Sequence, residues 1–167
     1  MRSLPEMAAL IALETGDDAN VLHGTIRGYR DKNYFQHCAF QGRKALYDDT
    51  ALARVRLLLS LQDHGFEGVK LANILSLIDN HDAPPVPGKI SPAGFARVID
   101  GIKAGEHWNF RFSADNQRMF WGGCRIHTTD SEKNYDIFED ELGALKGCHV
   151  VTMVDLSALL APLLKGD

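Results

Sequence analysis

The chain has 167 residues, of which 45% are hydrophobic and 24% charged, and its formal net charge at pH 7 is −4. This composition is ordinary for a globular protein, and the lack of any run of about 18 apolar residues argues against a membrane-spanning helix. The first residues lack the layout of a signal peptide, and the three cysteines form a sparse, odd-numbered set. We therefore expect a reduced, cytoplasmic protein with no membrane association.

The first part of the chain is predicted to form two helices and a small hairpin. Apolar residues at helical spacing favour a helix over residues 4–14, and a cluster of turn-forming residues follows at 15–20. A second helix is expected over residues 23–34. The next segment, 36–47, contains Gly42 and several basic residues, a composition that suits a short hairpin.

Two further helices are predicted in the next segment. The three residues Asp48–Thr50 are all favourable helix N-caps, and the apolar residues after them recur every three or four positions on one face. Gly65 is expected to end this helix. Phe66 then leads into another helix, in which the apolar spacing continues to Ile78.

A proline-rich stretch marks a boundary in the chain. Residues 81–89 contain three prolines and a glycine, which cannot continue a helix and favour an extended linker. We therefore expect one domain at 1–80 and a small α+β domain at 90–167. In the second domain the patterns predict, in order, a helix, two strands, a helix, a strand and a helix, at 91–103, 108–112, 117–121, 134–145, 150–154 and 156–164.

The charge is unevenly distributed along the chain. Residues 23–60 carry seven basic and three acidic side chains, a local balance of +4, so the remainder carries −8. Local charge governs contact with phosphate, because screening limits the reach of an exposed charge to about 8–10 Å. Arg27 and Arg30 share a helix face, and Arg43 and Lys44 lie in the expected hairpin. Charge alone would equally suit a solvated helix face.

Several motifs in this basic segment, taken in order, resemble the MerR-type winged helix-turn-helix. The motifs are Thr25-Ile26-Arg27-Gly28-Tyr29, Tyr47-Asp48-Asp49, Gly65-Phe66 and Leu71-Ala72-Asn73-Ile74-Leu75. They cover about a third of the chain. Four features depart from that family: the connection between the first two helices is longer, the wing motif is shifted by one residue, Glu67 stands where a capping Ser or Thr is common, and no long coiled-coil helix follows residue 80.

The resemblance implies a fold and a set of DNA contacts. The fold would be α+β, with an N-terminal winged helix-turn-helix, mostly helical with a small wing, followed by the second domain. The second helix would contact phosphates or the groove, the wing would contact the flanking backbone, and Tyr47 would anchor the wing. The implied DNA-binding residues are Thr25, Arg27, Tyr29, Arg30, Arg43, Lys44 and Tyr47.

The second domain has three competing interpretations. A leucine stripe at 156–164 suits an interface between two copies, although such a stripe is more often internal core. Five aromatic residues suit either a small-molecule effector pocket or, more commonly, plain core: Trp108, Phe110, Phe112, Phe120 and Trp121. Four residues have the ligand types of zinc: Cys124, His127, Cys148 and His149. Adjacent residues on a strand point to opposite sides, so we expect no metal site.

The chain is therefore interpreted as a sequence-specific regulator of transcription that binds double-stranded DNA as a homodimer. Residues 1–80 would bind DNA, and 90–167 would serve self-association or the sensing of an effector. No phosphate-binding glycine loop, nucleophile elbow or paired-histidine metal helix is present, so we expect neither an enzyme nor a cofactor. A protein-binding adaptor that uses the winged-helix scaffold without DNA is the alternative.

Overall fold

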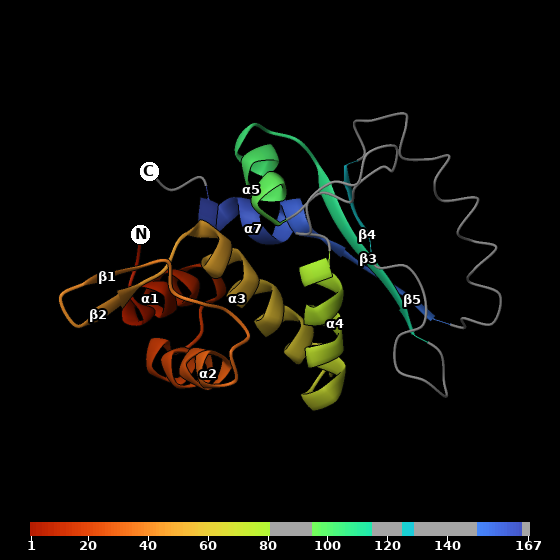
Figure 1. The fold of residues 1–167 in the computed structure, drawn as a ribbon. Coiled ribbons are helices and arrows are strands. Elements are labelled where there is room, and N and C mark those ends of the chain that lie inside the picture. Colours follow the sequence, from red (N-terminus) through yellow and green to blue (C-terminus); the bar gives the residue numbers. More distant parts are fainter. Residues whose placement is uncertain (81–94, 115–124, 129–149, 165–167) are drawn as a thin grey trace.

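The computed structural model describes residues 1–80, 95–114, 125–128 and 150–164 (Figure 1). The fold is α+β, as the sequence predicts. The described helices are α1 (Leu4–Thr15), α2 (Ala19–Asp31), α3 (Asp49–Asp63), α4 (Gly68–Asn80), α5 (Phe95–Lys103) and α7 (Leu156–Leu164). The described strands are β1 (Ala39–Gln41), β2 (Lys44–Leu46), β3 (Trp108–Ala114), β4 (Arg125–Thr128) and β5 (Val150–Asp155). The predicted linker at 81–89, strand at 117–121 and helix at 134–145 lie outside the described residues.

The connection between α1 and α2 consists of residues 16–18 and is shorter than the sequence indicated. Gly16 ends α1 in the left-handed conformation, with φ 82°. Asp18 caps α2, because its carboxylate accepts hydrogen bonds from the backbone N–H groups of Asn20, at 2.7 Å, and Val21. The helix therefore begins four residues earlier than expected, within the predicted turn. The long first connection, which departed from the MerR pattern, is absent.

The hairpin predicted within 36–47 is confirmed, and it closes through Gly42 and Arg43. Gly42 has φ 61°, which glycine adopts at little cost in a two-residue turn. Beyond β2, Tyr47 and Arg2 exchange two backbone hydrogen bonds of 2.8 Å. The N-terminal residues therefore lie beside β2, which leaves β1 as the outer strand of this ribbon among the described residues.

Helix α3 lies at the centre of the molecule (Figure 1). Its N-cap is Asp48, whose carboxylate accepts a hydrogen bond from the backbone N–H of Ala51 at 2.9 Å. The buried residues of α3 are Ala51, Leu52, Ala53, Val55, Leu57, Leu58, Leu59 and Leu61. Apolar residues around most of a helix indicate that it is covered on several sides, and α4, α5 and α7 all contact α3.

The second part of the chain contributes an antiparallel sheet in which β3 lies between β4 and β5. The aromatic residues Trp108, Phe110 and Phe112 alternate along β3 and are all buried, because alternate residues of a strand face the same side. One partner of β3 is β4, which the sequence pattern did not predict. The predicted strand at 150–154 and the helix after it are confirmed as β5 and α7.

The hydrophobic core is continuous between the two parts of the chain. Leu156, Leu160 and Leu163 of α7 are buried in the same cluster as the apolar residues of α1 and α3. Helix α5 also packs on both α3 and α7. Within the described ranges, no helix combines the length and apolar character that crossing a bilayer would need.

Candidate nucleic-acid interface

The burial pattern of α2 determines which way its arginines point. Leu22, Ile26 and Tyr29 are buried and form the face that packs on the core. Arg27 follows Ile26, so its side chain projects roughly 100° further around the helix, and it is exposed. Among the described residues Arg27 has no ion-pair partner, so its guanidinium group is available to an anion outside the chain.

The face of α2 away from the core includes two glycines. Gly24 and Gly28 lie one turn apart beside Arg27, and a Cβ atom at either glycine would meet nothing within 4 Å. Glycine within a helix costs about 1 kcal/mol relative to alanine. Since packing does not require glycine at these positions, the effect of the two glycines is to leave the backbone of this face accessible.

Two other predicted contact residues on α2 are already hydrogen-bonded within the chain. The Thr25 hydroxyl donates to the backbone carbonyl of Val21 at 3.2 Å. Arg30 donates to the Asp31 carboxylate through Nε, at 3.0 Å, and Nη2, at 2.6 Å. This hydrogen bond raises the pKa of Arg30, and Tyr47 contributes a smaller effect in the same direction. Arg30 is therefore less available than Arg27.

Tyr29 and Tyr47, both among the predicted DNA-binding residues, are buried, since only 4% of Tyr29 and 1% of Tyr47 is exposed. The Tyr29 hydroxyl donates to Gln62 on α3, and burial, together with the charge of Asp63, raises the pKa of Tyr29 to about 12. Tyr47 packs edge-on against Phe35, with ring centroids 5.3 Å apart. Both rings hold their elements on the core, so neither ring can cover a phosphate.

The hairpin presents one unpaired cation and one that is partly paired. Arg43 occupies the turn, is exposed, and has no ion-pair partner among the described residues. Lys44 Nζ lies 3.4 Å from the Glu6 carboxylate of α1, an exposed and therefore weak ion pair. The Ser3 backbone N–H and hydroxyl, followed by Lys44, lower the pKa of Glu6 to about 2.

The last turn of α2 adjoins the base of the hairpin. Tyr47 contributes to the raised pKa of Arg30, which lies in that turn, after the larger effect of Asp31. Tyr47 directly follows β2. Figure 1 shows α2 and the hairpin at one end of the molecule and the sheet of β3, β4 and β5 at the other. The two exposed arginines, Arg27 and Arg43, therefore belong to elements at the same end of the molecule.

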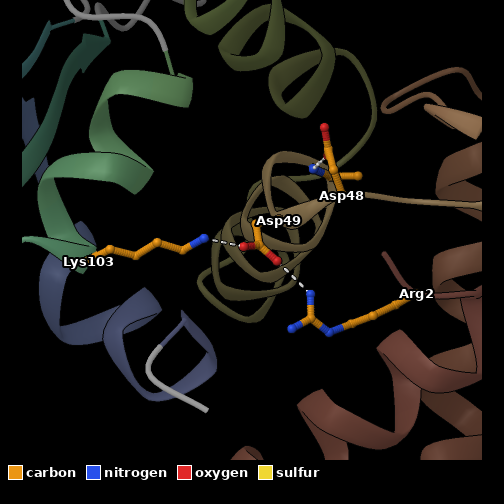
Figure 2. A network of polar contacts seen from close by, with 5 residues as sticks. Arg2, Asp48, Asp49 and Lys103 are labelled. Atoms are coloured by element: carbon orange, nitrogen blue, oxygen red, sulfur yellow. Dashed lines mark hydrogen bonds and ion pairs between the residues drawn. The ribbon is translucent and has the colours of Figure 1, made fainter. Parts of the chain in front are cut away.

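An ion-pair network fixes the hairpin against the rest of the molecule (Figure 2). Asp49, in the first turn of α3, accepts hydrogen bonds from Arg2, at 2.5 Å, and from Lys103 at the end of α5. Partial burial raises the pKa of Asp49, but the hydrogen bonds from Lys103 and Arg2 outweigh it, so the pKa lies below its ordinary value. Because the backbone of Arg2 pairs with Tyr47, this network links the hairpin to α3 and α5.

Two features of this end of the molecule were not predicted from the sequence. Phe40 on β1 is 62% exposed, and the His37 ring lies beside it with ring centroids 4.3 Å apart. The other is a cleft of about 420 Å³ between residues 33–38 and the first turns of α3, where Arg54 contributes to the lining. The exposure of Phe40 could have been inferred from the sequence, because a short hairpin cannot bury the aromatic residues on both of its faces.

An arginine in the middle of α3, Arg56, has a structural role. Arg56 donates two hydrogen bonds to Glu14 of α1, at 2.8 and 3.2 Å, and both side chains are largely buried. It therefore joins α1 to α3 and is not part of the exposed basic surface.

The three aromatic residues of β3, which suited either an effector pocket or plain core, are buried. Trp108, Phe110 and Phe112 are packed in the core, and the segment containing Phe120 and Trp121 lies outside the described residues. A cleft of about 650 Å³ lies elsewhere, between the ends of α1 and α3 and the elements β5 and α7. Of the four candidate zinc ligands, only His127 falls in a described element, β4.

Comparison with known proteins identifies no relative: no family model, no curated protein and no solved structure gives a significant match to the chain. The candidate interface therefore rests on geometry and charge alone.

Proposed function

We propose that this protein is a MerR-like regulator of transcription that binds double-stranded DNA with α2 and the β1–β2 hairpin. The observation that carries the proposal is the arrangement of these elements. Helices α1 and α2 are joined by a three-residue turn that contains glycine, and the β1–β2 hairpin follows α2. Both α2 and the hairpin carry an exposed arginine. A connection of this length is typical of the turn in a helix-turn-helix motif.

In this proposal α2 is the recognition helix and enters the major groove. Arg27 is the residue for base or phosphate contact, because an arginine in the groove binds the acceptor edge of guanine or a phosphate oxygen. The bare backbone at Gly24 and Gly28 allows α2 to approach the duplex closely. Arg43, and Lys44 once it leaves Glu6, hold the flanking backbone and set the register.

The proposed assembly is a homodimer, with the second part of the chain serving self-association or sensing. Helix-turn-helix proteins commonly bind as two-fold dimers, so that each copy reads one half of a palindromic site. The continuous core would then transmit the position of the second part to α3 and, through Asp49 and Arg2, to the hairpin.

The direct test is selection of bound sequences from a pool of random duplex DNA by the full-length protein. The proposal expects enrichment of one motif, arranged as an inverted repeat. Recovery of an unenriched pool, or binding that does not weaken as salt rises, would exclude the regulator and favour the protein-binding adaptor.

A further inference from the structure

Strand β5 is the outermost strand of its sheet among the described residues. The strand order is β4-β3-β5, so one side of β5 pairs with β3 and its other side pairs with no described strand. Edge strands are commonly protected from further pairing by lysine, proline or a bulge. Residues Val150–Asp155 contain neither lysine nor proline, and their pairing with β3 continues without a bulge. The strand therefore carries none of the usual barriers to pairing with another chain.

The cleft of about 650 Å³ runs along this edge. Four successive residues of β5, 152–155, line the cleft. Successive side chains of a strand point to opposite faces, so a cleft that touches all four follows the edge of the strand and not one face. In an antiparallel pair, alternate residues direct their backbone N–H and C=O groups away from the neighbouring strand. Some of the backbone groups of β5 therefore point toward the cleft.

The walls of the cleft offer contacts for apolar side chains. Leu61 of α3 and Leu159 of α7 line it, together with Phe66, whose ring packs edge-on against the Phe112 ring with centroids 5.3 Å apart. On the side of β5, Met153 is 62% exposed. Methionine is flexible and adapts its shape to different partners. The cleft can therefore bury an apolar side chain beside a strand edge.

The charges that line the cleft favour a cationic partner. Glu14 and Arg56 form an ion pair of 2.8 Å and largely neutralise each other. Asp155 caps α7 through the Ala158 N–H, lies 3.6 Å from His107 Nε2, and keeps 43% of its side chain exposed. With histidine neutral, the two carboxylates and one guanidinium give the lining a charge of −1. The last turns of α1 and α3 also face the cleft, and the C-terminal end of a helix attracts positive charge.

We infer that the edge of β5 and the cleft beside it bind an extended peptide segment of a partner protein, in which apolar side chains alternate with positions that include lysine or arginine. The segment adds a strand to β5 through main-chain hydrogen bonds, and its alternate side chains enter the cleft, which is how strand addition combines affinity with specificity. The basic side chain lies near Asp155. This activity goes beyond DNA binding and uses the other end of the molecule from α2 and the hairpin (Figure 1).

The experiment selects peptides from a random display library with the full-length protein and then measures binding of the enriched peptide. Met153→Lys and Ala158→Lys each place a cation at the cleft, on β5 and on α7. Phe40→Lys is the matched control, because Phe40 is also 62% exposed but lies on the hairpin at the other end. Hydrogen exchange of the β5 amides is followed with and without peptide, and circular dichroism checks that each variant is folded.

The expected peptides combine alternating apolar residues with lysine or arginine. Binding should slow the exchange of β5 amides, and each cleft variant should lose about tenfold in affinity, because lysine on an edge opposes strand pairing and like charges repel. Phe40→Lys should bind as wild type does.

Three results would overturn this inference. The first is the absence of an enriched peptide with this pattern. The second is a peptide that binds without changing the exchange of the β5 amides. The third is protection of these amides that rises with protein concentration in the absence of peptide and is lost in Met153→Lys, which would show that a second copy of the chain occupies the edge. DNA binding is tested separately by the duplex selection.

Discussion

At the scale of single residues, whether a side chain can contact another molecule depends on its partners within the chain more than on its residue type. Arg27 and Arg30 are three residues apart on one helix, yet Arg30 is bonded to Asp31 and Arg27 is not. Thr25 is held by the backbone of its own helix. The sequence could place these residues on a helix, but their partners depend on side-chain geometry that a periodic pattern does not contain.

Glycine at position 24 is predicted to weaken α2. Gly24→Ala should raise the free energy of unfolding by about 0.5–1 kcal/mol, because the position is helical and a Cβ there meets nothing within 4 Å. Gly42→Ala is the matched control, and it should lower the stability, because Gly42 has φ 61°. Urea unfolding measures both. Equal signs for the two variants would contradict this account.

At the scale of elements, short polar motifs decide where helices begin and how they are joined. Ser3 and Glu6 close the start of α1, Asp18 the start of α2, and Asp48 the start of α3. For α3 the sequence offered Asp48, Asp49 and Thr50 as possible caps, and the structure shows that Asp48 is the one used. Asp18 was missed because Asp17, Asp18 and Asn20 all suit a turn equally well.

The start of α1 should respond to acid through Glu6. The pKa of Glu6 is about 2 in the folded protein against an ordinary value of 4.5, so its contribution to stability is complete above pH 4.5 and is lost as the pH falls through 2. Glu6→Gln removes the titration but keeps an acceptor. The difference in unfolding midpoint between wild type and this variant should therefore shrink between these two pH values. A constant difference would show that the charge of Glu6 is irrelevant.

The network around Asp49 joins three elements, and a double-mutant cycle measures it. Asp49→Asn and Lys103→Ala should each destabilise the protein, and their coupling energy should be about 0.5–1 kcal/mol at low salt, because both side chains are partly exposed. The coupling should decrease at high salt. The cycle separates the ion pair from any effect of Asp49 on the start of α3. A coupling energy of zero would remove this link between the two parts of the chain.

At the scale of the whole molecule, the two parts of the chain share one core. The sequence predicted most of the elements, because helical and strand periodicities are local, as in α3 and the alternating aromatic residues of β3. It did not predict that α7 packs on α3, because long-range packing leaves no periodic signal. Nor did it predict β4, whose four residues, Arg125–Thr128, are too few to show a pattern.

A shared core predicts cooperative unfolding. Leu160 of α7 is fully buried, so Leu160→Ala should cost about 2–5 kcal/mol. Both tryptophans lie after residue 100, so their fluorescence reports the second part, while circular dichroism reports the helices of both parts. The two signals should give one midpoint in wild type and move together in the variant. A shift of the fluorescence transition alone would show that the parts unfold independently.

The most direct test of the proposed DNA-binding surface is the salt dependence of duplex affinity for three single variants and wild type. Arg27→Ala and Arg43→Ala should each weaken binding and lower the slope of log affinity against log salt by about 1, the loss of one phosphate contact. Arg97→Ala, which removes a charge from α5 on the other side of α3, should leave the slope unchanged (Figure 1). All three variants should retain the wild-type circular dichroism spectrum. Slopes for Arg27→Ala and Arg43→Ala that equal the wild-type slope would contradict the proposal that α2 and the hairpin grip the duplex.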